Sequence, residues 1–438
     1  MPNLLMAVTA AAGLIATSLI DGPVRAPDAN TTSFDVAGIK VILRESDANN
    51  VVAANLYLLG GSRQVTAANA GIEPLLLEVS DRGTRKYPRA TLRRKMSMLG
   101  SEITVAPSDD WTMFGIRATR EVFDSTWAIF ADRLMQPTLD PADVALIKTQ
   151  FISGIRQRRD DPDALADYLA DSIAFSGHPY GIPVVGTEAS ISAIDPRALR
   201  DYHASQIVKS RMLLVVVGDV DRSHIERLVR GTLGALPQGS YTWTLPPRLP
   251  ANGSAVVVES RDLPTNYLLG YFSGPLANSE DYHALRIATS VLTGRMFAEI
   301  RTRQNLTYDV HSPFLDRAAS AGGLYVSTVA PDTTIKLMLA AVRELQEGLL
   351  DPSGLERLER QFLTEYFLDN ETNDAQATFL ARAELYRGDY RAADRFVDEL
   401  KSVTPEQVRR VARQYIKGLR FAYVGDPRRF NRSLVNRF

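Results

Sequence analysis

The sequence contains no cysteine, few histidines and almost no net charge, and each of these shortages excludes a class of protein. Without cysteine the chain has no disulfide, no thiolate metal site and no cysteine nucleophile. Its 50 Lys and Arg residues nearly balance its 51 Asp and Glu residues, which leaves a formal net charge of -1. That balance lacks the basic excess typical of nucleic-acid binding, so no nucleic-acid partner is expected. No two of the five histidines have the short spacing of metal ligands: His178, His203, His224, His283 and His311.

Long apolar runs are also scarce, and one lies at the N-terminus. Residues 4–20 are uncharged and rich in Ala, Leu and Ile, which resembles the apolar core of a secretory signal. No basic residue precedes the run, the cleavage-site match at 24–26 is poor, and the run is short for a membrane span. We expect residues 1–30 to be a signal-like or disordered segment and the protein to be periplasmic or otherwise exported. A membrane anchor, or a cytoplasmic protein with a buried N-terminus, stays open.

The remaining chain repeats one pattern. The whole chain has 438 residues, 45% of them hydrophobic, which is typical of a globular protein too long for a single core. "TLDPADVALIKTQFISGI" begins at Thr138 and "LLDPSGLERLERQFLTEY" begins at Leu349. Pro141 and Pro352 are offset by 211 positions, and so are the Gln-Phe pairs that follow them. Each proline comes directly after an aspartate, which predicts a capped helix start in both copies.

The similarity continues downstream of these helices. "DDPDALADYLADSIAFSG" (160–177) corresponds to "NETNDAQATFLARAELYRG" (370–388), and both predict long helices. Residues 193–220 and 402–427 each predict a helix begun by proline and then an apolar strand ending in Val-Gly-Asp. A period near 210 is too long for a solenoid and indicates a duplicated domain.

These repeats define the expected domains. The first spans 31–235, the second spans 255–438, and the Pro- and Gly-rich stretch 236–254 is the linker. Residues 51–60 and 110–119 predict strands, and 125–135 predict a helix. The expected fold class is therefore α+β, with two homologous domains that each contain a mixed, mainly antiparallel sheet with helices on one face.

Three further segments carry a resemblance to a known family. They are "GGSRQ" (60–64), "HPYGIPVVGT" (178–187) and "IRTRQNLTYDV" (300–310). Their order and distances, together with the duplication, resemble the pitrilysin family of zinc metallopeptidases, which includes insulin-degrading enzyme and the mitochondrial processing peptidase. The resemblance covers about residues 35–430. It implies the subgroup with two α+β domains per chain that works as a dimer.

The family's zinc motif is missing from the place where the resemblance puts it. In active members His-x-x-Glu-His lies on one helix, where positions i and i+4 share a face and the Glu can take a proton from zinc-bound water. Aligned on Gly71 and on Gly83-Thr84, the first His falls on Pro74, the Glu on Leu77 and the second His on Glu78. A more distant Glu ligand falls near Gly154. We therefore expect no metal or other cofactor on this chain and zinc in a partner subunit.

The family's substrate-pairing edge strand is altered as well. In "SEITVAPSDDWTMF", Thr104 and Val105 occupy the positions where Asn-Ala is common, and Pro107 stands where Thr is usual. Proline has no N–H to donate to a strand ladder. Cleavage of a substrate on this chain's own first domain is not expected.

The second domain keeps the family's Arg/Tyr pair. Arg301 and Tyr308 are seven positions apart, as the resemblance requires. It implies that their guanidinium and phenol hold a substrate carbonyl and the oxyanion at the zinc site of the partner chain. The alternative is an ordinary surface arginine and a strand tyrosine. Phe297 and Ile300 are expected to belong to the core.

Three functional hypotheses follow. The leading one is a non-catalytic subunit of a heterodimeric zinc metallopeptidase, whose homologous partner carries His-x-x-Glu-His and which degrades peptides or unfolded polypeptides in an enclosed chamber. The second is a purely structural scaffold subunit of the same fold. The third is a self-sufficient enzyme with a different site. Presequence recognition is not expected, because 272–294 lacks the glycine run of the processing peptidases.

Overall fold

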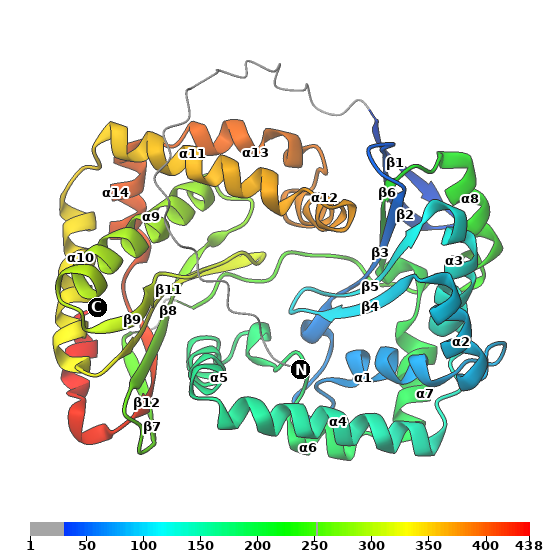
Figure 1. Cartoon of the computed structure of the whole chain (residues 1–438), viewed down its shortest axis with the longest axis horizontal. Helices are drawn as coiled ribbons and strands as arrows, with labels where there is room; N and C mark the ends of the chain where they lie inside the picture. Colours follow the sequence, from blue (N-terminus) through cyan, green and yellow to red (C-terminus); the bar gives the residue numbers. More distant parts are fainter. Residues whose placement is uncertain (1–29, 251–252) are drawn as a thin grey trace.

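The computed structural model describes residues 30–250 and 253–438. The expected signal-like or disordered segment spans residues 1–30, of which residues 1–29 lie outside the described residues. The described chain forms two six-stranded mixed sheets, one from each half of the sequence (Figure 1). The α+β class with two similar domains is confirmed.

The first sheet is built from the N-terminal half. Its strands are β1 (Thr31–Val36), β2 (Ile39–Glu45), β3 (Val51–Leu59), β4 (Glu102–Pro107), β5 (Trp111–Thr119) and β6 (Met212–Gly218), in the order β1-β2-β6-β3-β5-β4. Only the β2–β6 pair is parallel. The helices of this half are α1 (Ile72–Val79), α2 (Arg89–Leu99), α3 (Arg120–Met135), α4 (Pro141–Asp160), α5 (Pro162–Ala174), α6 (Glu188–Ala193), α7 (Pro196–Gln206) and α8 (Arg222–Gly231).

The second sheet repeats this strand order apart from β1, which has no counterpart among the described residues. Its strands are β7 (Ala255–Ser260), β8 (Asn266–Leu276), β9 (Thr307–His311), β10 (Phe314–Leu315), β11 (Ala319–Thr328) and β12 (Arg420–Gly425), in the order β10-β11-β8-β12-β7, with β9 also paired to β11. The β7–β12 pair is parallel, as β2–β6 is in the first sheet. The helices are α9 (Asp281–Met296), a π-helical segment (Phe297–Arg303), α10 (Pro331–Glu347), α11 (Pro352–Asp369), α12 (Asn373–Arg387), α13 (Ala392–Lys401) and α14 (Pro405–Tyr415).

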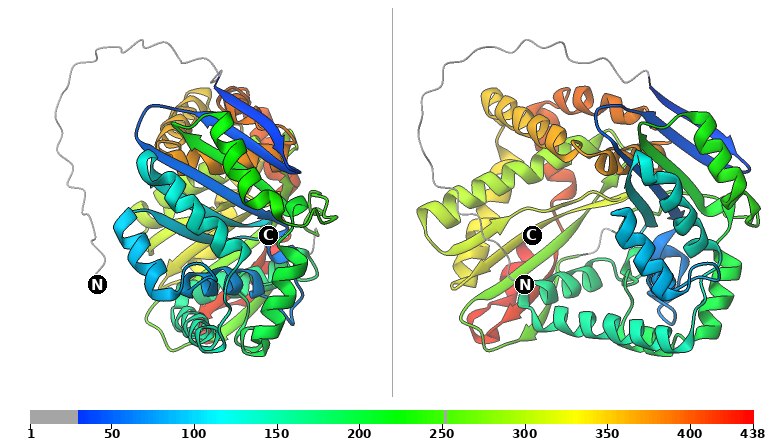
Figure 2. Two further views of the ribbon diagram at one scale, coloured as in Figure 1. Left: turned by 90° about the vertical axis from the view of Figure 1, so that its right-hand side faces the viewer. Right: turned by 45° about the vertical axis from the view of Figure 1, so that its right-hand side comes forward.

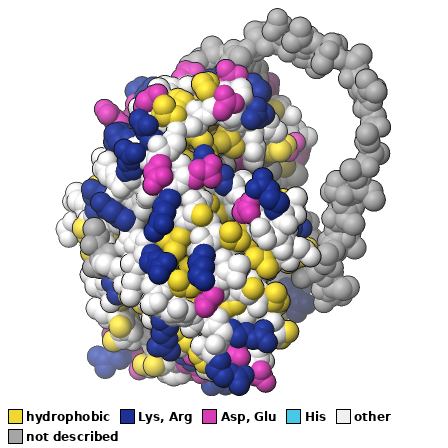
Figure 3. Space-filling model, turned by 90° about the vertical axis from the view of Figure 1, so that its left-hand side faces the viewer, with side chains coloured by type: hydrophobic (Ala, Val, Ile, Leu, Met, Phe, Trp, Pro, Cys, Tyr) yellow, Lys and Arg dark blue, Asp and Glu magenta, His cyan; other side chains and the backbone are white. Residues whose placement is uncertain are grey.

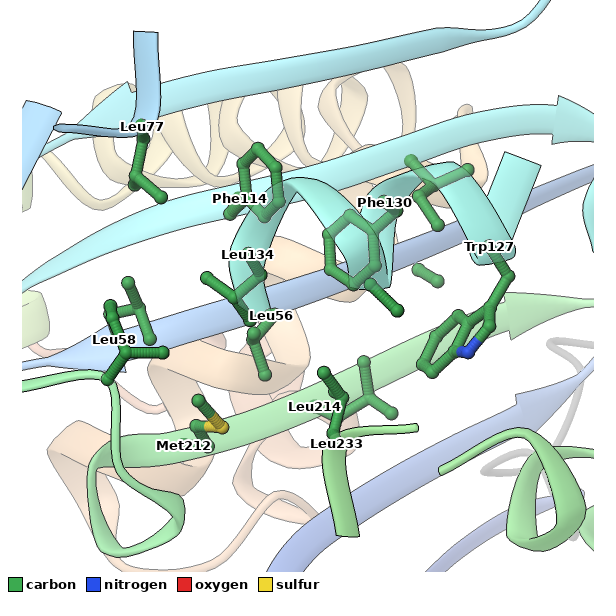
Figure 4. Packing of buried hydrophobic residues seen from close by; sticks show 14 of the residues in the cluster. Leu56, Leu58, Leu77, Phe114, Trp127, Phe130, Leu134, Met212, Leu214 and Leu233 are labelled. Atoms are coloured by element: carbon green, nitrogen blue, oxygen red, sulfur yellow. The ribbon is translucent and has the colours of Figure 1, made fainter. Parts of the chain in front are cut away.

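The helix starts lie where the Asp-Pro pairs predict them. Pro141 is in the first turn of α4, and the Asp140 carboxylate accepts the N–H of Ala142. Pro352 opens α11 directly after Asp351, but within the described residues the Asp351 side chain makes no capping hydrogen bond to a backbone N–H, so the predicted side-chain cap forms only at α4. In the first domain a connected core lies between one face of the sheet and its own helices. Figure 4 shows Leu77 in this core with Phe114 and Leu134.

The second face of each sheet is covered by a helix from the other domain. Helix α12 packs on β3 and β6 of the first sheet, where Ala377 and Leu380 join Tyr57 and Leu213 in one cluster. Helix α5 packs on β8 and β12 of the second sheet. Figures 1 and 2 show this exchange of helices between the domains. The two halves therefore share apolar cores as well as a linker.

The β4–β5 hairpin of the first domain and the β10–β11 hairpin of the second meet at the junction between the domains. Asp110, in the turn between β4 and β5, is 1% exposed. Its carboxylate accepts hydrogen bonds from Arg63 Nη1 (2.9 Å), Tyr180 Oη (2.7 Å), Tyr386 Oη (3.0 Å) and the backbone N–H of Ala318 (3.3 Å). Tyr180 follows α5 and Tyr386 ends α12, so one buried carboxylate ties both exchanged helices to the hairpins.

The first and second sheets divide between β6 and β7. Among the described residues of 236–254 there is no helix or strand. The domain limits at 235 and 255 stay predictions, because α5 and α12 cross between the domains. In 30–250 and 253–438 no helix is long and apolar enough to span a membrane.

Candidate functional site

Helix α1 carries the positions of the missing zinc motif, and its start depends on a glycine. Gly71 precedes the helix with φ of 85°, in the left-handed region that favours glycine. A Cβ built on it would lie 2.6 Å from the carbonyl oxygen of Val185. Pro74 lies in the buried part of α1, and Leu77 is 1% exposed within the first core. Helix α1 therefore uses these two positions for packing.

The acidic residues of α1 are also engaged with the protein. Glu73 is 2% exposed, and its Oε2 receives hydrogen bonds from Arg211 Nη1 (2.8 Å) and Tyr202 Oη (2.9 Å). Burial and the Glu73 charge raise the pKa of Tyr202. Burial also raises the pKa of the Glu78 carboxyl, against the opposing charge of Arg133. Sequence reasoning missed the Glu73–Arg211 pair, because only the fold brings these distant positions together.

The residues at the motif positions do not fit a zinc ion. Pro74 and Leu77 have no ligand atom, and Glu78 contributes one carboxylate, whereas zinc sites in proteins use three or four ligands. Gly154 lies on an exposed part of α4 with no heavy atom within 4 Å of a built Cβ, so nothing there replaces the distant ligand. In the described part of the chain no group of three His, Asp or Glu side chains could hold a metal.

The five histidines are dispersed over the fold. Each binds a different neighbour: His178 the Pro247 carbonyl (2.9 Å), His203 the Leu134 carbonyl (2.8 Å), His224 Asp124 (2.6 Å), His283 Glu399 (3.1 Å) and His311 Asp309 (3.3 Å). His178 also accepts the N–H of Tyr180 on Nδ1 (3.1 Å). The His-Pro-Tyr-Gly segment thus orients the tyrosine that binds Asp110.

Strand β4 forms one edge of the first sheet. The N–H of Ser108 donates to the Trp111 carbonyl (2.8 Å), which fixes the alternation of the β4–β5 ladder. By that alternation Ile103, Val105 and Pro107 turn their backbone groups to the free edge. Pro107 has no N–H, so this part of the edge offers two backbone donors where three would be usual.

Arg301 and Tyr308 are brought together in the second domain. Arg301 lies in the π-helical segment and Tyr308 on β9. The guanidinium carbon of Arg301 is 5.0 Å from the centroid of the Tyr308 ring and 4.8 Å from that of Phe297. The expectation that Phe297 is a core residue is wrong, because its side chain is 42% exposed and flanks Arg301. Ile300 is fully buried, as expected.

Both polar groups of this pair face solvent with free hydrogen-bonding capacity. Tyr308 is 78% exposed. Within the described residues neither its hydroxyl nor the Arg301 guanidinium makes a hydrogen bond or ion pair. A guanidinium offers five N–H donors and a phenol offers one O–H, and both suit a carbonyl oxygen or an oxyanion. The two flanking rings limit the directions that the guanidinium can take.

Fold and site together define a class of protein. It has the duplicated α+β architecture of a two-domain metallopeptidase, an assembled Arg/Tyr pair and a first domain without zinc ligands. Two family models match the chain in sequence order. The model described as insulinase (peptidase family M16) matches residues 40–188, and the one described as peptidase M16 inactive domain matches residues 193–362.

Relatives cover most of the chain. A protein named as an uncharacterised zinc protease of Mycobacterium leprae is 26% identical over 86% of this chain and 87% of its own length. The mitochondrial-processing peptidase subunit beta of Blastocladiella emersonii is 24% identical over 86% of this chain and 84% of its own length.

Solved structures share the fold. A protease from Helicobacter pylori superposes with a TM-score of 0.82 at 16% identity, over 90% of this chain and 99% of that one. A peptidase M16 inactive domain from Pseudomonas fluorescens superposes with a TM-score of 0.81 at 20% identity, over 91% of this chain and 98% of that one. The chain belongs to the M16 family of peptidases, and it resembles the members of inactive-subunit type.

Proposed function

We propose that this chain is the non-catalytic subunit of a heterodimeric zinc metallopeptidase. Its partner is a homologous subunit with His-x-x-Glu-His, which supplies the zinc and the general base. This chain supplies Arg301 and Tyr308, which hold the substrate carbonyl and the oxyanion formed during attack. The two subunits enclose a chamber in which peptides or unfolded polypeptides are cut.

The assembled Arg301–Tyr308 pair is the observation that supports this function most. The guanidinium carbon of Arg301 lies 5.0 Å from the centroid of the Tyr308 ring, and the donors of both side chains are free to bind the same ligand. The contrast with α1 adds to it, because Pro74 and Leu77 are used for packing while the second-domain pair stays open to a ligand. This pattern fits a subunit that acts at a zinc held elsewhere.

Hydrolysis of a quenched peptide tests the proposal. The chain, a His-x-x-Glu-His homologue from the same genome, and their mixture are compared. We expect activity to appear or rise sharply only in the mixture. Arg301→Ala and Tyr308→Phe should each lower kcat/KM of the mixture about 10²-fold, as loss of an oxyanion donor does in other hydrolases.

Arg303→Ala is the matched control. Arg303 lies on the same π-helical segment, but its guanidinium pairs with Glu299, whereas that of Arg301 contacts Tyr308. It should leave the rate within about twofold, since exposed ion pairs contribute little. Equal losses for Arg303→Ala and Arg301→Ala, or an unchanged rate in both Arg301 and Tyr308 variants, would refute the catalytic role. A mixture that neither associates nor cleaves would favour the scaffold alternative.

We also propose that the protein works outside the cytoplasm. The apolar segment 4–20 supports this location. Fractionation of cells expressing the full chain should place it in the periplasm or with exported material. Recovery with the cytoplasmic fraction alone would rule this out and leave the peptidase proposal standing.

A further inference from the structure

A strongly basic surface lies on the outer side of the first domain, around helix α2. Residues 81–100 contain seven Lys or Arg and one acidic residue, although the whole chain carries a net charge of -1. Figures 1 and 2 show α2 on the side of the first domain that faces away from the second domain. The outer face of the second domain differs, since basic and acidic side chains are interspersed there (Figure 3).

Five of these cations are exposed and have no anionic partner. They are Arg85, Lys86, Arg93, Arg94 and Lys95, and in the described part of the chain none of them forms an ion pair. The Tyr87 ring holds two of them in place, with Lys86 Nζ 5.2 Å and Lys95 Nζ 5.9 Å from its centroid. Like charges kept this close repel one another, which an acidic ligand would relieve.

The basic side chains border a hollow between α2 and α3. Its volume is about 640 Å³, and Arg94 and Lys95 line it together with the apolar Met98, Leu99 and Ile129. The one carboxylate in its lining, Asp124, is bound to His224 (2.6 Å). Met98 is 80% exposed, while Ile129 is 1% exposed and forms part of the floor. The hollow thus combines an apolar base with a cationic rim.

Helix α2 is attached to the domain by little of its own surface. Leu92 is its one fully buried side chain, in a small cluster with Tyr87 and Ile129 that is separate from the main core. Most of an 11-residue helix is therefore presented to solvent with its cations outward. A helix in a soluble domain ordinarily buries a wider stripe.

We propose that the α2–α3 groove binds an acidic, amphipathic segment of a partner protein. Its apolar side chains would contact Met98, Leu99 and Ile129, and its carboxylates would pair with Arg94 and Lys95, as an amphipathic helix does in a groove. A hollow suits an inserted segment better than a flat bilayer. Met98 is also the only large apolar side chain of α2 that is exposed, whereas interfacial helices bury a wide apolar face in lipid. This site lies away from Arg301 and Tyr308, so its test is independent of the peptidase proposal.

Fluorescence anisotropy with defined peptides tests this site on the full chain. The probe is a labelled 14-residue peptide with Glu and Leu at helical spacing. Two comparison peptides replace every Glu by Lys or every Leu by Ser. We expect saturable binding of the first peptide at least tenfold tighter than of either comparison, weakening with salt.

Two double charge reversals locate the binding surface. R94E/K95E should weaken binding at least tenfold. R227E/R230E makes the same charge change on exposed positions of α8 in the same domain and should leave binding within twofold; equal melting temperatures show that both variants fold. Equal weakening by the two variants, or no saturable binding of the Glu/Leu peptide, would overturn the proposal. So would tighter binding of phosphatidylglycerol vesicles or of an RNA duplex than of that peptide.

Discussion

At the scale of single residues, Pro74 and Leu77, which the resemblance places at zinc-motif positions, are buried in the first domain. Leu77 is 1% exposed in a cluster with Phe114 and Leu134, although the family's motif has a glutamate there. Gly154 has free space around it and would accept a side chain. Position 77 of α1 therefore lies in apolar surroundings, whereas position 154 of α4 is open.

Replacing Leu77 tests these apolar surroundings directly. Leu77→Glu places an unpaired carboxyl in the core and should reduce stability by roughly 3 kcal/mol or more. Leu77→Met keeps the volume and should cost less than about 1.5 kcal/mol. Thermal melting of the purified chain measures both. Equal melting temperatures for wild type and Leu77→Glu would show that this position still faces a polar space.

Asp109 gives the junction a pH dependence of its own. Burial raises the pKa of this carboxyl from 3.8 to about 6, against the opposing charge of Arg317, whose Nη1 is 3.1 Å away. The folded state holds the proton more tightly than the unfolded state. The contribution of protonated Asp109 to folding stability is therefore full below about pH 3.8 and is lost as pH rises through about 6.

Asp109→Asn should remove this contribution to the pH dependence. Wild type should lose roughly 2.5 kcal/mol more than the variant between pH 4 and pH 7, because each pKa unit corresponds to about 1.4 kcal/mol and most of the shift of about two units is expressed in this range. Melting temperatures of the two proteins across this range supply the measurement. Only the difference in slope between the two curves of melting temperature against pH matters. Parallel curves would show that Asp109 is not the source of this pH dependence.

At the scale of elements, the hairpin turns and the exchanged helices depend on one buried carboxylate. Asp110 accepts hydrogen bonds from Tyr180 and Tyr386, which lie at the ends of equivalent helices in the two halves. It also neutralises Arg63, whose side chain is 11% exposed. One residue of the first domain therefore joins the segment after α5 to the last turn of α12.

Asp110→Ala should loosen this junction strongly. It leaves Arg63 without its charge partner and two buried hydroxyls without an acceptor, which costs about 3–5 kcal/mol. Asp47→Ala, in an exposed loop, is the control and should be neutral. Limited proteolysis should cut the connecting stretch 236–254 faster in Asp110→Ala. A melting temperature and cleavage rate equal to those of Asp47→Ala would speak against the clamp.

Local sequence signals predicted most elements, and long-range packing produced what they missed. The Asp-Pro pairs located α4 and α11, and the apolar Val-Gly-Asp runs located β6 and β12. The Arg301–Tyr308 pair was predicted from the resemblance to the pitrilysin family and has no local sequence signal of its own. The outward position of Phe297 was missed, because an aromatic residue in an apolar helix pattern is ordinarily buried. The π-helical segment instead turns its ring toward Arg301.

At the scale of the whole molecule, the two halves share one sequence pattern, and each sheet has one face covered by a helix of the other half. Each half contributes a helix whose apolar face fits the other half's sheet. Periodicity in the sequence shows that α5 and α12 are helices, but it does not say which sheet they cover. The expectation of helices on one face therefore holds for each domain's own helices, and the exchange explains how the second face of each sheet is protected from water.

Expressing the two halves separately tests whether each half needs the helix that the other half supplies. A fragment ending at 235 would expose Tyr57, Trp111 and Leu213, which α12 covers in the whole chain. An exposed apolar face of that kind promotes aggregation. We expect residues 31–235 alone to aggregate or to bind a hydrophobic dye, and co-expression with 236–438 to restore a soluble complex on size-exclusion chromatography. A soluble, monomeric 31–235 fragment that melts cooperatively would mean that the halves fold independently and only later exchange helices.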